Sequence, residues 1–250
     1  MSFGYYQLET GRVTAIENDC PFPPLSQALI DPNGLIAIGG DLNAQRLLNA
    51  YSQGIFPWFN EDEPVMWWSP NPRMVLFPVE LKISNSLNKT IKKASFDVRF
   101  NTAFRDVITA CSQAKRVKQS GTWISPDMIN AYCELNQLGH AICMESWRSN
   151  QLVGGCYGVI INNMFYGESM FHTQTDASKV AFAHLVQHLQ QQGVGMIDCQ
   201  MHTPLLASFG AREIEREEFM QNLTKLVHFW HELTEWTAAT QTTILCDYAI

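Results

Sequence analysis

The sequence predicts an α/β fold, with a small N-terminal domain over residues 1–72 and a larger domain over residues 73–250. The larger domain is expected to contain a mixed, mostly antiparallel sheet. One reason is a hairpin signal, in which two apolar runs flank Asn162-Asn163, a pair that tolerates the left-handed conformations of a tight turn. A second reason is the helical pattern that follows, which leads into a short apolar strand at 196–200.

The N-terminal segment contains one clear helix signal. An apolar run over residues 33–41 is closed by a glycine pair, and Asp41 or Asn43 can then cap a helix that continues to about Ser52. Residues 56–60 are expected to form a rigid aromatic loop. The proline-punctuated link that we take as the domain boundary contains Trp67, Trp68, Pro70 and Pro72.

The larger domain alternates strands and helices. Its expected elements before the hairpin are a strand near 75–77, a helix over 84–94, an extended segment at 97–100, helices over 102–112 and 126–138, and a strand over 141–148. The hairpin joins strands over 152–161 and 164–170, and Asp176 or Ser178 can cap the helix that runs to Gln192. A strand, a hairpin, a helix and a strand in this order are typical of an α/β acyltransferase core.

Composition excludes several classes of protein. The chain has 250 residues, 46% hydrophobic and 16% charged, which is typical of a globular protein and not of a disordered one. No stretch approaches the roughly 20 apolar residues of a membrane span, and the start MSFGYYQLET does not resemble a signal peptide. Seven cysteines without a Cys-x-x-Cys pair favour free thiols in a reducing compartment, so a cytoplasmic location is expected.

The charge distribution is uneven. The net charge is −7, but the segment from Lys82 to Lys118 carries nine basic and two acidic residues. That segment is therefore +7 and the remainder −14. Such asymmetry indicates a site for a polyanion, because Lys and Arg neutralise phosphates. A solvated surface of the protein is the alternative, and charge alone does not exclude it.

Two carboxylates lie in apolar strand contexts, Glu168 in FYGESMF and Asp198 in MIDCQ. Burial of an isolated carboxylate is costly, so each needs a partner or a chemical role. A structural ion pair is one possibility, for example with Lys179 on the following helix. Strands on either side of one helix can also lie adjacent in a sheet, and Gln200 shares a strand face with Asp198 by the period of two. An acid and an amide on one face can bind an amine and a carbonyl together.

Trp58 and Trp123 lie in predicted loops, where packing against the core is the common role of a large aromatic and stacking on a nucleobase is the alternative.

No metal site is expected. The helical histidine pairs, which have no evident third ligand, are His184 with His188 and His228 with His231.

Ten ordered stretches of the sequence match one family: PNGLIAIGGDL, GIFPWF, WWSPNPR, GTWI, LGHA, LVGGCYGV, FYGESMF, DASK, IDCQ and SFGA. On these stretches the chain resembles the leucyl/phenylalanyl-tRNA–protein transferases over most of its length. The resemblance implies a small N-terminal domain joined to a GNAT-like acyltransferase domain. It also implies transfer of leucine or phenylalanine, sometimes methionine, from aminoacyl-tRNA to proteins that begin with Arg or Lys, which marks them for degradation.

The resemblance also implies roles for individual residues. Asp198 and Gln200 match an acid and an amide that position and help to deprotonate the attacking α-amine, and Glu168 matches the acidic residue of the GESMF motif. Trp58 and Trp123 match aromatics that hold the 3′-terminal adenosine. The residues that match an apolar pocket for the amino-acid side chain are Cys156, Phe165, Met170, Leu185 and Ile197. Those that match a basic tRNA-binding stretch are Lys89, Lys92 and Lys93.

The sequence departs from the family's pattern at four positions. Asn85 and Asn88 stand where relatives can have basic residues, Leu205 stands where a histidine is expected, and Cys156 stands where a methionine can occur.

No cofactor is expected, because an aminoacyl ester is already activated, and a monomer is expected. The chain after Phe171 lacks the glycine-rich pyrophosphate loop of a CoA-dependent relative. A CoA-dependent N-acyltransferase and a non-catalytic RNA-binding protein are the alternatives, and the division of roles between Glu168 and Asp198 is left open.

Overall fold

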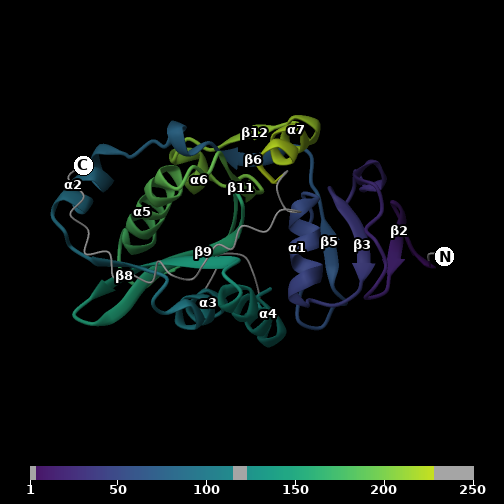
Figure 1. The fold of residues 1–250 in the computed structure, drawn as a ribbon, viewed down its shortest axis with the longest axis horizontal. Coiled ribbons are helices and arrows are strands. Elements are labelled where there is room, and N and C mark those ends of the chain that lie inside the picture. Colours follow the sequence, from purple (N-terminus) through teal and green to yellow (C-terminus); the bar gives the residue numbers. More distant parts are fainter. Residues whose placement is uncertain (1–3, 115–122, 228–250) are drawn as a thin grey trace.

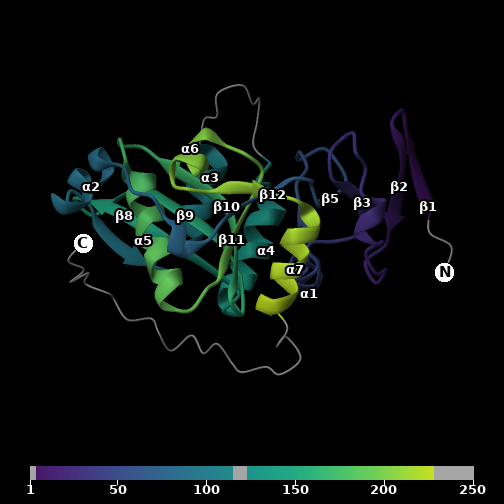
Figure 2. The ribbon, with the colours of Figure 1, turned by 90° about the horizontal axis from the view of Figure 1, so that it is seen from above.

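The computed structural model describes residues 4–114 and 123–227, which form two sheets. The first sheet has five strands in the order β1-β2-β3-β5-β4. Its strands are β1 (Gly4–Leu8), β2 (Gly11–Ile16), β3 (Leu35–Gly39), β4 (Phe56–Pro57) and β5 (Met66–Trp68). Helix α1 (Ala44–Ser52) connects β3 to β4, and Asn43 caps it by accepting a hydrogen bond from the backbone N–H of Arg46 at 2.8 Å. This sheet lies at one end of the molecule (Figures 1 and 2).

The second sheet has seven strands in the order β12-β6-β11-β10-β9-β8-β7. Its strands are β6 (Arg73–Leu76), β7 (Asp97–Phe100), β8 (Ala141–Arg148), β9 (Gln151–Ile161), β10 (Met164–His172), β11 (Met196–Gln200) and β12 (Arg212–Ile214). Its helices are α2 (Asn85–Lys92), α3 (Phe104–Gln113), α4 (Pro126–Gln137), α5 (Ala177–Gln191), α6 (Pro204–Ser208) and α7 (Arg216–Val227). Only β10 and β11 pair in parallel among these described strands, which confirms a mixed, mostly antiparallel sheet.

Two faces of the second sheet are covered by helices. Helix α5 packs against β8, β9 and β10 on one face, and α3 and α4 lie on the opposite face (Figure 1). The predicted hairpin at Asn162-Asn163 is confirmed, and Asn162 has the left-handed φ of +50° that such a turn requires. Gly154 permits the close approach of α5 to β9, because a Cβ atom there would lie 2.6 Å from the Cβ of Ala177.

Part of the N-terminal prediction is wrong. The aromatic loop predicted over residues 56–60 begins with strand β4, in which Phe56 and Pro57 pair with β5. The segment that includes Trp67 and Trp68, predicted as a link, belongs to β5. Aromatic residues favour strands, and a proline is tolerated in β4 because this is an edge strand, which needs fewer backbone donors.

The core continues from the first sheet into the second. One cluster of buried apolar residues contains Leu47 and Tyr51 of α1 together with Tyr132 of α4, Tyr166 of β10 and Phe219 of α7. We keep the domain division at residue 72 as a proposal. The change of sheet between β5 and β6 supports it, although the two parts share this core.

The parallel pair β10–β11 positions the candidate functional site. The two strands pair over only three residues each, ending at Tyr166 and Asp198. Beyond this point the register of β10 against β9 shifts between Gly167 and Ser169, so Glu168 occupies a bulge. The register of β11 against β6 shifts just before Gln200. As a result the strands separate where Glu168 and Gln200 project, and a cavity opens there.

Candidate active site

An apolar cavity of about 470 Å³ lies where β10 and β11 separate. Most sequence-predicted site residues line it: Trp58, Trp123, Cys156, Phe165, Glu168, Met170, Leu185, Ile197 and Gln200. Further lining residues that the sequence analysis did not select include Phe182, Cys199 and Leu206. The structure thus brings together the predicted adenosine aromatics, the predicted side-chain pocket and two of the three predicted polar groups.

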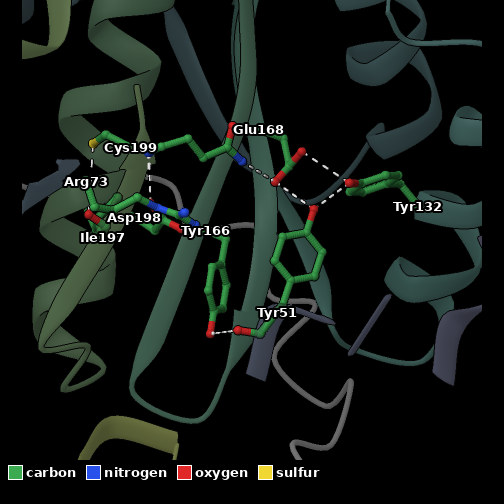
Figure 3. A network of polar contacts seen from close by, with 9 residues as sticks. Tyr51, Arg73, Tyr132, Tyr166, Glu168, Ile197, Asp198 and Cys199 are labelled. Carbon is green, nitrogen blue, oxygen red and sulfur yellow. Dashed lines mark hydrogen bonds and ion pairs between the residues drawn. The ribbon is translucent and has the colours of Figure 1, made fainter. Parts of the chain in front are cut away.

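Glu168 is held by three hydrogen-bond donors (Figure 3). The Tyr51 hydroxyl donates to Oε1 at 2.8 Å, the Tyr132 hydroxyl to Oε2 at 3.1 Å, and Gln200 Nε2 to Oε1 at 2.9 Å. Burial raises the pKa of Glu168 to about 7, although the hydrogen bonds from Tyr51 and Tyr132 act in the opposite direction. A carboxyl group with this pKa can exchange a proton near neutral pH.

The ion pair considered for Glu168 is not formed. Lys179 Nζ instead lies 3.0 Å from Asp176 Oδ1. Tyr51 and Tyr132, which bind Glu168 instead, were missed by the sequence analysis. Tyr51 showed only the apolar spacing of its helix, and that spacing carries no signal for a polar partner on β10.

Asp198 has the structural ion pair that was considered, with Arg73 as its partner. Arg73 Nε donates to Oδ1 at 2.8 Å and Arg73 Nη2 to Oδ2 at 2.7 Å, and both side chains are buried. The Arg73 guanidinium also lies between the rings of Phe56 and Phe219, 4.7 Å from each centroid. Asp198 is not among the residues that line the cavity in the described part of the chain. Its charge still acts on Glu168, whose pKa it helps to raise.

The neighbour through which Asp198 reaches the cavity is Gln200. The backbone N–H of Gln200 donates to Asp198 Oδ1 at 2.8 Å, and Gln200 has a left-handed φ of +61°. A residue with a Cβ atom rarely adopts this conformation without support from its surroundings. Asp198, fixed by Arg73, supplies that support, and the Gln200 amide then points to Glu168.

The two tryptophans contact the same cavity but differ in exposure. Trp58 is partly exposed, and its ring contacts that of Trp68 edge-to-face at 5.6 Å between centroids. Trp123 is 8% exposed and packs within the core cluster. Trp123 therefore both packs in the core and lines the cavity, whereas Trp58 has more exposed surface for contact with a ligand.

Comparison with known proteins identifies the family. The family "Leucyl/phenylalanyl-tRNA protein transferase" matches residues 75–224, and its N-terminal domain matches residues 40–71. The leucyl/phenylalanyl-tRNA–protein transferase of Chromobacterium violaceum is 57% identical over 206 residues, which are 82% of this chain and 88% of that protein. The chain belongs to this family. The transferase of Nitrosomonas eutropha is 54% identical over 224 residues, 90% of this chain and 95% of that protein.

Solved structures align with this member of the family only weakly. L-PGS from Bacillus licheniformis aligns with a TM-score of 0.44 and 10% identity, over 90% of this chain and 85% of that one. A GCN5-related N-acetyltransferase-like protein from Streptococcus suis aligns with a TM-score of 0.35 and 12% identity, over 69% and 64% of the two chains. Scores this low support no conclusion about activity.

The positions where the chain departs from the family's pattern have clear places in the fold. Leu205, at the expected histidine position, lies on α6 and lines the cavity. Cys156 on β9 is buried, and burial raises the pKa of its thiol well above the usual value. Asn85 begins α2, and Asn88 lies one turn later on the same helix.

The three predicted tRNA-binding lysines lie outside the cavity. Lys89 and Lys92 are exposed on α2, and Lys93 is exposed at its end. Arg99, from the same basic segment, pairs with Asp97 at 2.6 Å. The other basic residues of that segment that fall outside the described residues are Lys115, Arg116 and Lys118.

The described residues contain no group of three or more His, Cys, Asp or Glu side chains that could hold a metal ion. They also contain no helix long and apolar enough to span a membrane. His184 and His188 are partly buried, and burial lowers the pKa of each. His228 and His231 lie outside the described residues.

Proposed function

We propose that this protein transfers leucine or phenylalanine, and also methionine, from aminoacyl-tRNA to the α-amino group of proteins with an N-terminal Arg or Lys, which marks those proteins for degradation. Membership of the family supports the reaction. The observation that carries the proposal is the composition of the cavity. Among its described lining residues Glu168 is the one carboxylate, and most of the others are apolar or aromatic.

The apolar part of the cavity suits a leucyl or phenylalanyl side chain. Phe165, Met170, Leu185 and Ile197 supply apolar surface, and Cys156 adds a small thiol that stays uncharged. Such a surface favours an apolar side chain of about the right size but discriminates weakly between similar ones. This supports acceptance of methionine together with leucine and phenylalanine.

Trp58 and Trp123 line the same cavity as the side-chain pocket. An aminoacyl ester joins the amino acid directly to the terminal ribose of the tRNA, so the adenosine must lie next to the amino acid. The two tryptophans thus offer aromatic surface to the base while the amino-acid side chain occupies the apolar part. This proximity supports an aminoacyl-adenosine end as the bound group.

The chemistry requires orientation, removal of a proton from the amine, and attack on the ester carbonyl. Glu168 lines the cavity and has a pKa of about 7, so we assign the role of proton acceptor to this residue. Gln200 positions the amine through its amide, and Asp198 positions Gln200. Both carboxyl oxygens of Asp198 already accept hydrogen bonds from Arg73, so Asp198 is proposed as a positioning residue and not as the base.

A direct assay tests the proposed function. Radiolabelled Leu-tRNA is incubated with the protein and a peptide beginning with Arg, and label is expected in the peptide. The same peptide with an acetylated N-terminus is the matched control and is expected to stay unlabelled, since it has no free amine. Labelling by acyl-CoA without tRNA would favour the N-acyltransferase alternative, and tRNA binding without product would favour an RNA-binding protein.

Substitution of Trp58 tests the adenosine site. Trp58→Ala is expected to weaken binding of a 3′-aminoacyl-adenosine analogue by about 1–3 kcal/mol, the usual range for loss of stacking on a base. Trp58 is the better choice because Trp123 also packs in the core. Binding is measured by titration calorimetry with the analogue and with full-length tRNA. Loss of affinity for the tRNA alone would contradict the stacking assignment.

Substitution of the α2 lysines tests the tRNA surface. The variants Lys89→Ala, Lys92→Ala and Lys93→Ala are each expected to lower the affinity for different tRNAs by the same factor. Each should also reduce the slope of log affinity against log salt concentration by roughly one unit, because one phosphate contact is lost. Lys225→Ala, an exposed lysine on α7, is the control and should leave the slope unchanged. An unaltered slope in the triple variant would assign α2 to the solvated surface.

We also propose that the protein is a monomer in the cytoplasm. Light scattering of the purified protein tests the first statement, and fractionation of cells tests the second.

A further inference from the structure

Three oxygen-bearing side chains from three separate elements form a closed ring at the edge of the cavity. Tyr51 comes from α1, Tyr132 from α4, and Glu168 from the bulge of β10. The two hydroxyl oxygens lie 2.5 Å apart, and each is within 3.1 Å of a different oxygen of the Glu168 carboxyl group (Figure 3). Both tyrosines are fully buried, and Glu168 is partly buried where it lines the cavity.

The number of hydrogens in the ring depends on the charge of Glu168. Three oxygen–oxygen contacts need three hydrogens, one for each contact. If Glu168 is ionised, the two hydroxyl groups supply only two hydrogens, and one contact between oxygens has none. If Glu168 is protonated, its own O–H completes the set. The ring can therefore hold two or three hydrogens: both hydroxyl groups donate to the ionised carboxylate, and one additional proton is accommodated when Glu168 is protonated.

The surroundings leave Glu168 as the group that gains or loses this proton. The pKa of each tyrosine hydroxyl is raised well above its ordinary value, mainly by burial and then by Glu168, so both hydroxyls stay protonated. Gln200 faces Glu168 from β11 and contributes no titrating group. Asp198, also on β11, faces it as a charge, but Arg73 holds both oxygens of that carboxylate.

We propose that the Tyr51–Tyr132–Glu168 ring stores the proton released by the attacking α-ammonium group, with Tyr51 and Tyr132 as positioning residues for the Glu168 carboxylate. This inference rests on the proposed transfer reaction. In the step, an N–H bond of the ammonium group breaks, its electron pair stays on nitrogen, and the proton forms an O–H bond with Glu168. The amine then attacks the ester carbonyl, and a second amine proton passes to the ribose oxygen that leaves. The stored proton returns to solvent after release of the product.

The experiment follows the Glu168 carboxyl group directly. The full-length protein is labelled with ¹³C at glutamate side-chain carboxyls. The signal of Glu168 is assigned by its absence from the spectrum of the Glu168→Gln variant. Its titration is recorded by NMR without tRNA or peptide, so the readout does not depend on activity. The variants are Tyr51→Phe and Tyr132→Phe. Each removes one hydroxyl donor to the carboxylate and keeps the packing of the aromatic side chain. Tyr166→Phe is the matched control, since its buried hydroxyl donates to the backbone carbonyl of Tyr51 at 2.8 Å and not to Glu168.

We expect the Glu168 midpoint to rise by about one pH unit in each ring variant, because a hydrogen bond to a charged group is lost. The midpoint in Tyr166→Phe should match that of the wild type. The pH at which peptide transfer is half-maximal should move upward by the same amount as the midpoint. An unchanged Glu168 midpoint in both ring variants would overturn the proposal, as would a shifted midpoint with an unshifted pH profile of transfer. If the wild type transfers nothing, the proposed function fails instead, and the titration still reports whether the ring exists.

Discussion

Asp198→Asn is expected to lower the free energy of unfolding by about 3–5 kcal/mol, the usual cost of removing one partner from a buried ion pair. Arg73 keeps its charge when Asp198 loses its own. The guanidinium is then buried without an opposite charge, because Arg73 exposes 1% of its side chain. Urea denaturation measures the loss. Asp176→Asn is the control, and it should cost less than about 1 kcal/mol because the Asp176–Lys179 pair is partly exposed.

A double variant separates the structural from the functional role of this pair. Arg73→Met with Asp198→Leu replaces both charges by apolar groups of similar size, which should recover most of the lost stability. Transfer should stay low, because the backbone N–H of Gln200 then has no carboxylate to accept its hydrogen bond. A stable double variant with normal transfer would show that the pair serves stability alone, and an unchanged urea midpoint in Asp198→Asn would refute the predicted loss.

Glu168→Gln is expected to lower the transfer rate by about two or more orders of magnitude, the usual effect of losing an acid–base group. Glutamine keeps the size of the side chain and one acceptor oxygen but takes up no proton. In the wild type the rate should rise as pH increases through about 7, because Glu168 ionises there. The variant should lack this rise. A folded Glu168→Gln protein with normal turnover would exclude Glu168 as the proton acceptor.

The same variant should become more stable than the wild type as pH rises. Burial raises the pKa of Glu168 from 4.5 to about 7, so the folded protein favours the protonated form. The resulting stability is fully present below pH 4.5 and is lost as pH rises through 7, up to about 3 kcal/mol. Glutamine does not ionise and avoids this loss. Urea denaturation of both proteins at pH 5 and pH 8 checks the difference, which should grow toward pH 8.

The sequence predicted regular elements where local signals were strong. Asn43 as a helix cap and the Asn162-Asn163 turn were both confirmed, because each acts on residues within a few positions along the chain. The short strands of the first sheet gave weaker signals. Phe56 and Pro57 were predicted as part of a loop, since a two-residue strand has no measurable periodicity and is fixed only by its partner β5.

Partners at the site depend on contacts that no local pattern encodes. Arg73 reaches Asp198 across 125 positions of the sequence, and Tyr51 reaches Glu168 across 117. The apolar strand contexts correctly indicated that both carboxylates needed partners, and the structure buries Asp198 fully and Glu168 partly. They did not distinguish a cation from a pair of hydroxyl groups, because desolvation requires compensation but does not specify its source.

The hydrogen bond from Tyr51 to Glu168 joins α1, which accompanies the first sheet, to a strand of the second. With Glu168 as the proposed proton acceptor, the proton chemistry then depends on a residue that does not line the cavity. A substitution that rotates or shifts α1 changes the donor to Glu168 without changing any residue that lines the cavity. Variation in α1 thus gives related enzymes a route to adapt their working pH with the apolar pocket around Phe165, Met170 and Ile197 unchanged.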